Sequence, residues 1–258
     1  MKTEKFVKQR AREALKGNLV QLIAAMAMAF AAFMLTDIVQ TIVVLLTQKV
    51  DFETGEVVSS DNIIYFSIVA GTVVVLLFAS PLLNGFFKAA ANAVEYGDCE
   101  ARDVFFYFRS AGLYFKTVAV DLLLYLIFAV ITGVLNFSNY ISLLFPNGAN
   151  NAGDYALVIA AAVLTGAVYV LAYMIFLHYP LMIYALRSDI SVAKCVFGTI
   201  GFSFKHFGKL FKLMLSYAGW FALCFFVVPA LYVIPYFYAG SMLSAKWLLE
   251  LENRGGAL

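Results

Sequence analysis

Charged residues are scarce in this chain: 13% of its 258 residues are charged, while 63% are hydrophobic. Soluble domains carry charge on roughly a quarter of their residues. A soluble core could not bury this much apolar surface, so the composition excludes a soluble globular protein. The sequence predicts instead a protein of the lipid bilayer.

Residues that carry chemistry are also few. The chain has 2 His and 3 Cys, and Cys99, Cys195 and Cys224 have no CxxC or other metal-binding spacing. The first two cysteines are predicted to lie on the cytoplasmic side, where thiols stay reduced, so no disulfide is expected. No HExxH, GxSxG, Walker or GxGxxG motif occurs. We therefore expect no enzymatic activity, no cofactor and no metal centre.

The basic residues are distributed unevenly along the chain. Of the 18 Lys and Arg residues, all except Lys49 lie before the first apolar run, in every second gap between apolar runs, or in the C-terminal tail. Lys49 shares its gap with four acidic residues. Loops rich in Lys and Arg stay in the cytoplasm because basic segments resist translocation. The pattern predicts a multi-pass membrane protein with its N-terminus and C-terminus in the cytoplasm.

Six apolar runs reach the length of about 20 residues that a helix needs to cross a hydrocarbon core of about 30 Å. The predicted fold class is therefore all-α, a polytopic protein in which residues 1–258 form a single integral membrane domain. The predicted transmembrane helices are Leu19 to Leu46, Ile63 to Phe87, Thr117 to Leu135, Tyr155 to Leu186, Leu210 to Val228, and Leu231 to Leu249.

Two segments of the chain resemble each other. Residues 106–116 and 202–212 share the pattern F-x-F-[RK]-x-x-G-x-x-F-K at an offset of 96 residues, and Gly17 lies 95 residues before Gly112. The spacing predicts a threefold repeat of a cytoplasmic interfacial helix, a glycine and a membrane hairpin, related by an axis along the membrane normal. A chance coincidence of Phe, Lys and Gly remains the alternative, and the first copy rests mainly on Gly17. The units are 1–87, 88–186 and 187–258.

The cytoplasmic segments combine apolar stripes with basic faces. Near the N-terminus apolar residues recur at three- and four-residue spacing while basic residues occupy other faces, which is typical of a helix in the headgroup plane. The apolar residues are Phe6, Val7, Ala11, Ala14, Leu15 and Leu19, and the basic ones are Lys5, Lys8, Arg12 and Lys16. A helix packed beneath the bundle fits equally well. Anionic lipids are the expected partners, and nucleic acid is not expected because no basic segment is free of the membrane. The candidate lipid-facing residues are Lys5, Lys8, Arg12, Lys16, Arg109, Lys116, Lys205 and Lys212.

Three ionisable residues within the predicted transmembrane helices are candidates for function, because charge at membrane depth is costly. Asp37 is expected near the outer surface, where a solvated carboxylate is the plainer interpretation. Asp121 suits a structural ion pair with Lys116 or Lys212 better than a proton site. His178, two residues before a proline, suits a hydrogen-bonded core histidine or a pH switch.

Three segments carry a resemblance to a known family. Residues 9–18 (QRAREALKGN), 209–220 and 234–236 resemble the bacterial integral membrane proteins grouped as domain of unknown function nine-seventy-five. The similarity extends over nearly the whole chain, and more distantly to the membrane domain of some glycerophosphodiester phosphodiesterases. It implies about six transmembrane helices in a bacterial, Gram-positive cytoplasmic membrane, and it transfers no catalytic residue. The family's glycine-rich turn between the last two helices is replaced here by residues 225–230, FFVVPA.

Two functions fit these observations. A small transporter or permease-like subunit would require a hydrated cavity lined by Asp37, Asp121 or His178. A membrane scaffold or accessory protein would instead have a solid core and a basic, aromatic-rich cytoplasmic face that binds anionic lipid or partner proteins. The cavities of the structure should favour one of these functions.

Overall fold

The computed structural model describes residues 4–47, 49–50, 57–58, 61–137, 140 and 152–255. These residues are almost entirely helical, and a two-residue antiparallel pairing joins β1 to β2. Five helices are long and apolar enough to span a membrane, which confirms an all-helical, multi-pass class of protein. They are Leu19–Val43, Val69–Glu95, Ala111–Val134, Gly153–Leu186 and Val227–Asn253.

The described elements follow one another closely along the chain. In order they are α1 (Glu4–Leu15), α2 (Leu19–Thr47), β1 (Lys49–Val50), β2 (Val57–Val58), α3 (Asp61–Val74), η1 (Val75–Ala79), α4 (Ser80–Glu95), η2 (Ala101–Phe108), α5 (Ala111–Val134), α7 (Ala152–Tyr173), η3 (Met174–His178), α8 (Tyr179–Leu186), η4 (Lys194–Gly198), α9 (Thr199–Lys205), α10 (Phe207–Ser216), α11 (Ala218–Phe221), η5 (Ala222–Phe225) and α12 (Val227–Gly255).

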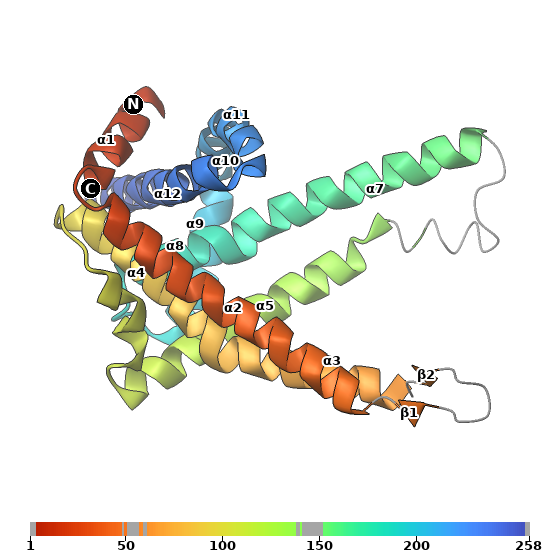
Figure 1. Cartoon of the computed structure of the whole chain (residues 1–258). Helices are drawn as coiled ribbons and strands as arrows, with labels where there is room; N and C mark the ends of the chain where they lie inside the picture. The colour runs from red at the N-terminus through yellow and green to blue at the C-terminus, as the bar shows by residue number, and fades with distance from the viewer. Residues whose placement is uncertain are drawn as a thin grey trace.

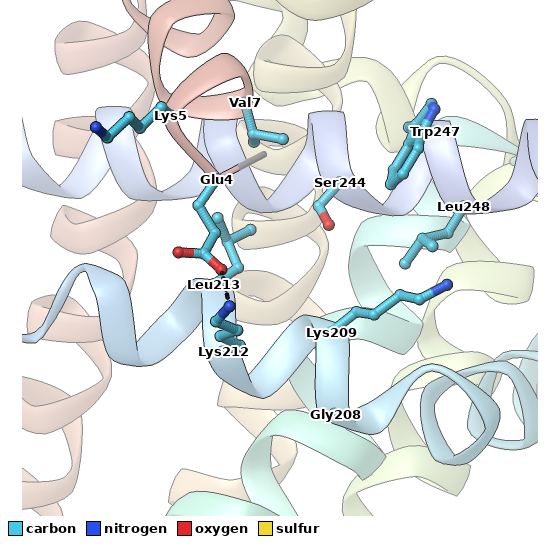
Figure 2. Close-up of a pocket in the computed structure, with 10 residues that line it drawn as sticks. All are labelled: Glu4, Lys5, Val7, Gly208, Lys209, Lys212, Leu213, Ser244, Trp247 and Leu248. Carbon is cyan, nitrogen blue, oxygen red and sulfur yellow. Dashed lines mark ion pairs between the residues drawn. The ribbon is translucent and has the colours of Figure 1, made fainter. Parts of the chain in front are cut away.

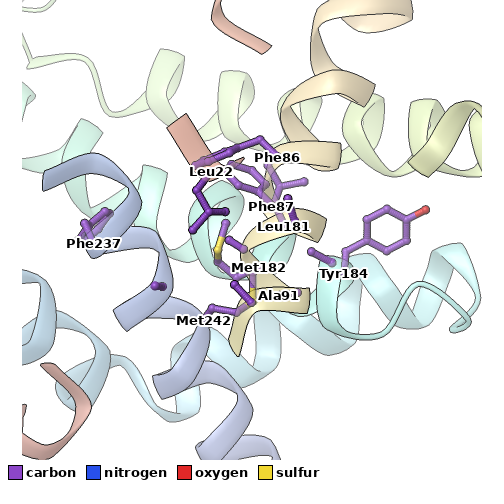
Figure 3. Close-up of a cluster of buried hydrophobic side chains, with 14 of the residues drawn as sticks. Leu22, Phe86, Phe87, Ala91, Leu181, Met182, Tyr184, Phe237 and Met242 are labelled. Atoms are coloured by element: carbon purple, nitrogen blue, oxygen red, sulfur yellow. The ribbon is translucent and has the colours of Figure 1, made fainter. Parts of the chain in front are cut away.

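The long helices converge at the end of the molecule that carries both chain termini (Figure 1). The α2 helix lies along α3 and α4, α5 and α7 extend away on another side, and α1 packs against α12. The main core forms where α2, α4, α8 and α12 meet, around Leu22, Phe86, Met182 and Met242 (Figure 3). The apolar stripe of α1, formed by Val7, Ala11 and Leu15, is buried. This helix therefore packs beneath the bundle and does not lay its apolar face on lipid.

A proline accounts for the widened turn in the second long helix. Pro81 has no N–H to donate to the carbonyl of Leu77, four residues earlier, and the π-helical turn η1 lies at this point. The Tyr114 hydroxyl donates to that Leu77 carbonyl at 2.8 Å. A second π-helical turn, η3, likewise comes just before Pro180. Each of these two long helices thus contains a π-helical turn just before its proline.

The predicted transmembrane helix from Leu210 to Val228 is not formed as one helix. The chain there forms three short segments, α10, α11 and η5, and the described residues contain five candidate spans where six were predicted. The end of α10 is held in place because Lys8 donates to the carbonyl of Ser216 at 2.5 Å. Ala218 and Gly219 follow shortly after Ser216. Their small size adds little packing, and glycine is a weak helix former. Apolar composition alone could not reveal this break.

These short segments fold back along α12 as a hairpin. The ring of Tyr217 lies 5.1 Å from that of Tyr236, and the ring of Trp220 lies 6.5 Å from that of Tyr232, so the two arms run antiparallel. The tip, residues 225–228, is apolar and strongly exposed, between 67% at Phe226 and 91% at Phe225. An exposed apolar tip of this kind requires lipid or another protein around it.

The glycines of the proposed repeat fall into two groups. Gly112 and Gly208 are each the second residue of a helix, α5 and α10 respectively. Gly17 instead has a φ of 96° in the turn between α1 and α2, a conformation that favours glycine. The helix that contains Gly112 has 24 residues, whereas the one that contains Gly208 has 10. The threefold repeat stays a prediction.

Candidate functional site: a basic pocket and a buried acid

A pocket of about 460 Å³ lies between α1, α10 and α12, near the two chain ends. Its lining combines charged groups from α1 and α10 with the ring of Trp247 from α12 (Figure 2). Residues one helical turn apart lie on the same helix face and line the pocket together. Gly208 and Lys212 do so on α10, and Ser244 and Leu248 on α12. The lining residues are Glu4, Lys5, Val7, Gly208, Lys209, Lys212, Leu213, Ser244, Trp247 and Leu248.

The pocket has an excess of positive charge. Its lining includes three lysines and one glutamate, and Glu4 pairs with Lys212 at 3.1 Å. Lys209 extends along α10 toward Trp247 and Leu248, whereas the ammonium of Lys5 is directed away from the other labelled side chains (Figure 2). Within the described ranges neither Lys5 nor Lys209 forms a salt bridge. An anionic group in this pocket would meet ammonium donors and a hydroxyl, Ser244, over an apolar floor.

Further charged groups lie close to the pocket. Glu252 accepts from Lys205 at 2.5 Å and lies 3.6 Å from the His206 ring. Burial lowers the pKa of His206, and the Glu252 carboxylate opposes that shift, so this imidazole adds little positive charge at neutral pH. Burial likewise lowers the pKa of Lys8, whose ammonium lies over the Tyr217 ring at 4.6 Å. Lys8 therefore serves to fix α1 to the hairpin.

The predicted lipid-facing basic residues are not equivalent in the structure. Lys5 and Lys212 line the pocket, and the sequence interpretation did not include Lys209 and Trp247, which line it too. Most of the others have protein partners. Lys8 donates to the backbone carbonyl of Ser216 and Lys116 to that of Ser188, while Arg12 lies over the Tyr236 ring. Arg109 is paired with Asp103 and Lys205 with Glu252, and Lys16 is exposed. The sequence did contain a signal for Lys209, because its spacing of three residues from Lys212 puts both on one helix face.

Asp121 forms a buried polar cluster with α4. It is 0% exposed, and it accepts from the Ser80 hydroxyl at 2.6 Å and from the Asn84 amide at 2.7 and 2.8 Å. The ion pair predicted for it is absent from the salt bridges of the described chain, since Lys116 donates to a carbonyl and Lys212 pairs with Glu4. Ser80 and Asn84, four residues apart on one helix face, are the partners that the sequence interpretation overlooked.

The other two intramembrane candidates differ from each other in exposure. His178 is 1% exposed, and neither ring nitrogen has a hydrogen-bond partner among the described residues. Its ring stacks on Phe237 at 5.1 Å, so it is an aromatic-packed histidine and not the hydrogen-bonded one expected. Asp37 is exposed and lines a cavity of about 490 Å³ between α2, α3 and α5, together with Gln40 and Tyr125.

The cysteines are structural. Cys99 and Cys195 are buried free thiols, and burial raises the pKa of each to about 12. A thiol with so high a pKa is a poor nucleophile and a poor metal ligand. Across the described ranges no group of three or more His, Cys, Asp or Glu side chains is arranged to hold a metal ion.

The fold and these sites define a helical multi-pass membrane protein with a basic pocket at the end that carries both termini. The chain matches no protein-family model, and no curated protein or solved structure is significantly similar to it. The family resemblance of residues 9–18, 209–220 and 234–236 therefore stays a prediction.

Proposed function

We propose that this chain is a non-enzymatic protein of a bacterial cytoplasmic membrane that binds anionic lipid headgroups in the pocket between α1, α10 and α12. In this role it acts as a scaffold or accessory protein whose cytoplasmic face organises lipids or partners. The single observation that carries the proposal is a pocket lined by Lys5, Lys209 and Lys212 beside Trp247. Each basic residue near an anionic surface contributes about 1 kcal/mol of attraction.

The distribution of cavities supports this function over transport. A transporter needs its intramembrane charge beside water, yet Asp121 and His178 are fully buried and line none of the cavities described above. The convergence of α2, α4, α8 and α12 makes a packed core instead. Aromatic and basic groups gather on the face that the charge pattern assigns to the cytoplasm.

The same proposal includes a specific arrangement in the membrane. We place four crossings, by α2, by α3 to α4, by α5 and by α7 to α8, and a hairpin of α10 to α12 that enters from the cytoplasmic side and returns to it. Support comes from Val227, at the tip, which lines a cavity with Phe30 and Phe33, about halfway along α2. The other end of the hairpin arm, Ser216, is bonded to Lys8 of α1. The even number of crossings keeps both termini on one side.

The decisive experiment measures phosphatidylglycerol that remains bound to the purified protein. The triple variant Lys5→Gln, Lys209→Gln and Lys212→Gln is compared with wild type after reconstitution in nanodiscs of phosphatidylcholine and phosphatidylglycerol, by native mass spectrometry. Loss of three contributions of about 1 kcal/mol each predicts roughly 100-fold weaker binding.

A matched control separates a pocket from a diffuse basic surface. The variant Lys16→Gln, Arg102→Gln and Lys194→Gln removes the same charge at exposed positions that do not line the pocket. The proposal expects this control to retain most of the bound phosphatidylglycerol. Equal losses in both triple variants would show that binding is a property of the whole surface, and would refute the pocket.

Transport is the second candidate, and it rests on the cavity that Asp37 lines. If the protein transports a solute, His178→Ala and Asp121→Asn should abolish a transport-linked phenotype at normal membrane abundance. If it acts through its cytoplasmic face, neutralising Lys5, Lys8, Arg12 and Lys16 should cause the defect. Both sets are compared in one deletion strain at matched expression.

A further inference from the structure

The cluster around Asp121 lies away from the basic pocket and has no part in lipid binding. Asp121 is the eleventh residue of α5, so it lies about 15 Å along a helix of 24 residues at 1.5 Å per residue. Ser80 and Asn84, its partners on α4, are each 1% exposed. A carboxyl group is thus held near the middle of a transmembrane helix, out of contact with water.

Among the residues that the structure describes, no cation balances the charge of Asp121. The ionisable groups that interact with it are Tyr107 of η2, Tyr125 of α5, Tyr184 of α8 and Cys195 of η4. Phenols and thiols in buried positions are neutral, so none of them balances a negative charge. A buried carboxylate without a countercharge costs several kcal/mol, and such a group takes up a proton instead.

The contacts to the carboxyl group favour a proton over a metal cation. Its two oxygens face the amide nitrogen of Asn84 and the hydroxyl of Ser80. A hard cation such as Na⁺ would need carbonyl, carboxylate or water oxygens in those places. The Ser80 hydroxyl can accept from a protonated carboxyl as readily as it donates to an ionised one.

A short chain of hydroxyl groups connects this carboxyl to a cavity. The Tyr125 side chain lies within interaction distance of Ser80, and the Ser80 hydroxyl donates to Asp121 at 2.6 Å. Tyr125 also lines the cavity of about 490 Å³ that contains Asp37 and Gln40. We propose that Asp121 is a proton-binding site, filled from this cavity through Tyr125 and Ser80.

The proton balance of the transfer is simple. Tyr125 accepts a proton on its hydroxyl oxygen from a hydronium ion in the cavity, which becomes water, and passes its own proton to the Ser80 oxygen. Ser80 in turn gives its proton to the Asp121 carboxylate, which becomes a neutral acid. Tyr125 and Ser80 end as they began, and one proton has moved from the cavity to Asp121. The reverse sequence releases it.

The test is infrared spectroscopy of the whole protein at pH 7 in dodecyl maltoside, a detergent without ester carbonyls. A protonated carboxyl group gives a carbonyl stretching band that an ionised one lacks. We expect this band in wild type and in Asp37→Asn, and its loss in Asp121→Asn. Absence of the band at pH 7 would show that Asp121 is ionised, and its persistence in Asp121→Asn would show that another group produces it. Either result would overturn the proposal.

Two further arms test the ligand and the route. Replacing choline chloride by sodium chloride should leave the band unchanged, and its loss in sodium would reassign the site to a metal cation. In heavy water the band shifts as the acidic proton exchanges for deuterium. Tyr125→Phe keeps the aromatic ring and should slow this exchange with the band retained, whereas an unchanged rate would exclude the route through Tyr125.

Discussion

Replacement of Gly85 by alanine should destabilise this protein more than any other single methyl addition in its helices. Gly85 lies in α4 where η2 crosses it, and a Cβ built there would lie 1.8 Å from the carbonyl oxygen of Val104 and 2.4 Å from its carbonyl carbon. An ordinary contact begins at 3.4 Å. The obstructing atoms belong to the backbone, so no side chain can rotate away, and η2 as a whole must move off α4.

The expected cost can be worked from this overlap. Overpacking of a core costs about 1–3 kcal/mol, and a backbone obstruction belongs at the upper end of that range. Alanine is about 1 kcal/mol more favourable than glycine in a helix, which offsets part of this cost. The net loss is therefore about 2 kcal/mol, which lowers the Tm of a chain of this size by about 4–8 °C.

Thermal unfolding in detergent, followed by circular dichroism, measures the shift. Gly166→Ala in α7 is the matched control, because a Cβ there has no atom within 4 Å. The control should unfold at or slightly above the wild-type temperature. If Gly85→Ala and Gly166→Ala have the same Tm, η2 does not lie against α4 as described and the reasoning fails.

Three other predictions concern topology, the thiols and a buried amide. A cysteine at position Ser59, which lies outside the described residues, should react with an impermeant maleimide on intact cells, while one at Ser110 should not; the reverse labelling would overturn the assignment of sides. Cys99 and Cys195, whose pKa burial raises to about 12, should stay unlabelled by maleimide at pH 7 in detergent until the protein is denatured. Asn18→Ala should cost about 1–3 kcal/mol in chemical denaturation, since the buried amide bridges the α1–α2 turn to the loop after α4; an unchanged midpoint would contradict this.

The helical, membrane-spanning class could be predicted because it depends on composition and on the length of apolar runs. The first four candidate spans overlap the first four predicted transmembrane helices. The fifth, Val227–Asn253, covers the last predicted one. The break between residues 210 and 228 could not be predicted. It depends on tertiary contacts, such as the bond from Lys8 to Ser216, between residues 208 positions apart.

The candidate sites were predicted less completely than the fold. Lys5 and Lys212 were named as basic residues at the cytoplasmic face, but their convergence on one pocket requires the packing of α1 on α12. The sequence interpretation recognised that a carboxylate at the position of Asp121 is costly to bury. It assigned the wrong partners because it expected a basic residue to balance the charge. Ser80 and Asn84, which hydrogen-bond to Asp121, are common polar residues. Only their burial in the structure distinguishes them.

The contact between the first and last helices has a consequence for how the protein is made. The stripe of Val7, Ala11 and Leu15 packs against α12, which begins only at Val227. At the usual synthesis rate of about 5–20 residues per second, the stripe waits roughly 10–40 s for its partner. During that interval the membrane surface is the apolar phase within reach, so α1 should lie there as an amphipathic helix and leave it when translation ends. A chain truncated before α12 would keep that stripe exposed to chaperones and proteases, which could then distinguish incomplete from complete molecules.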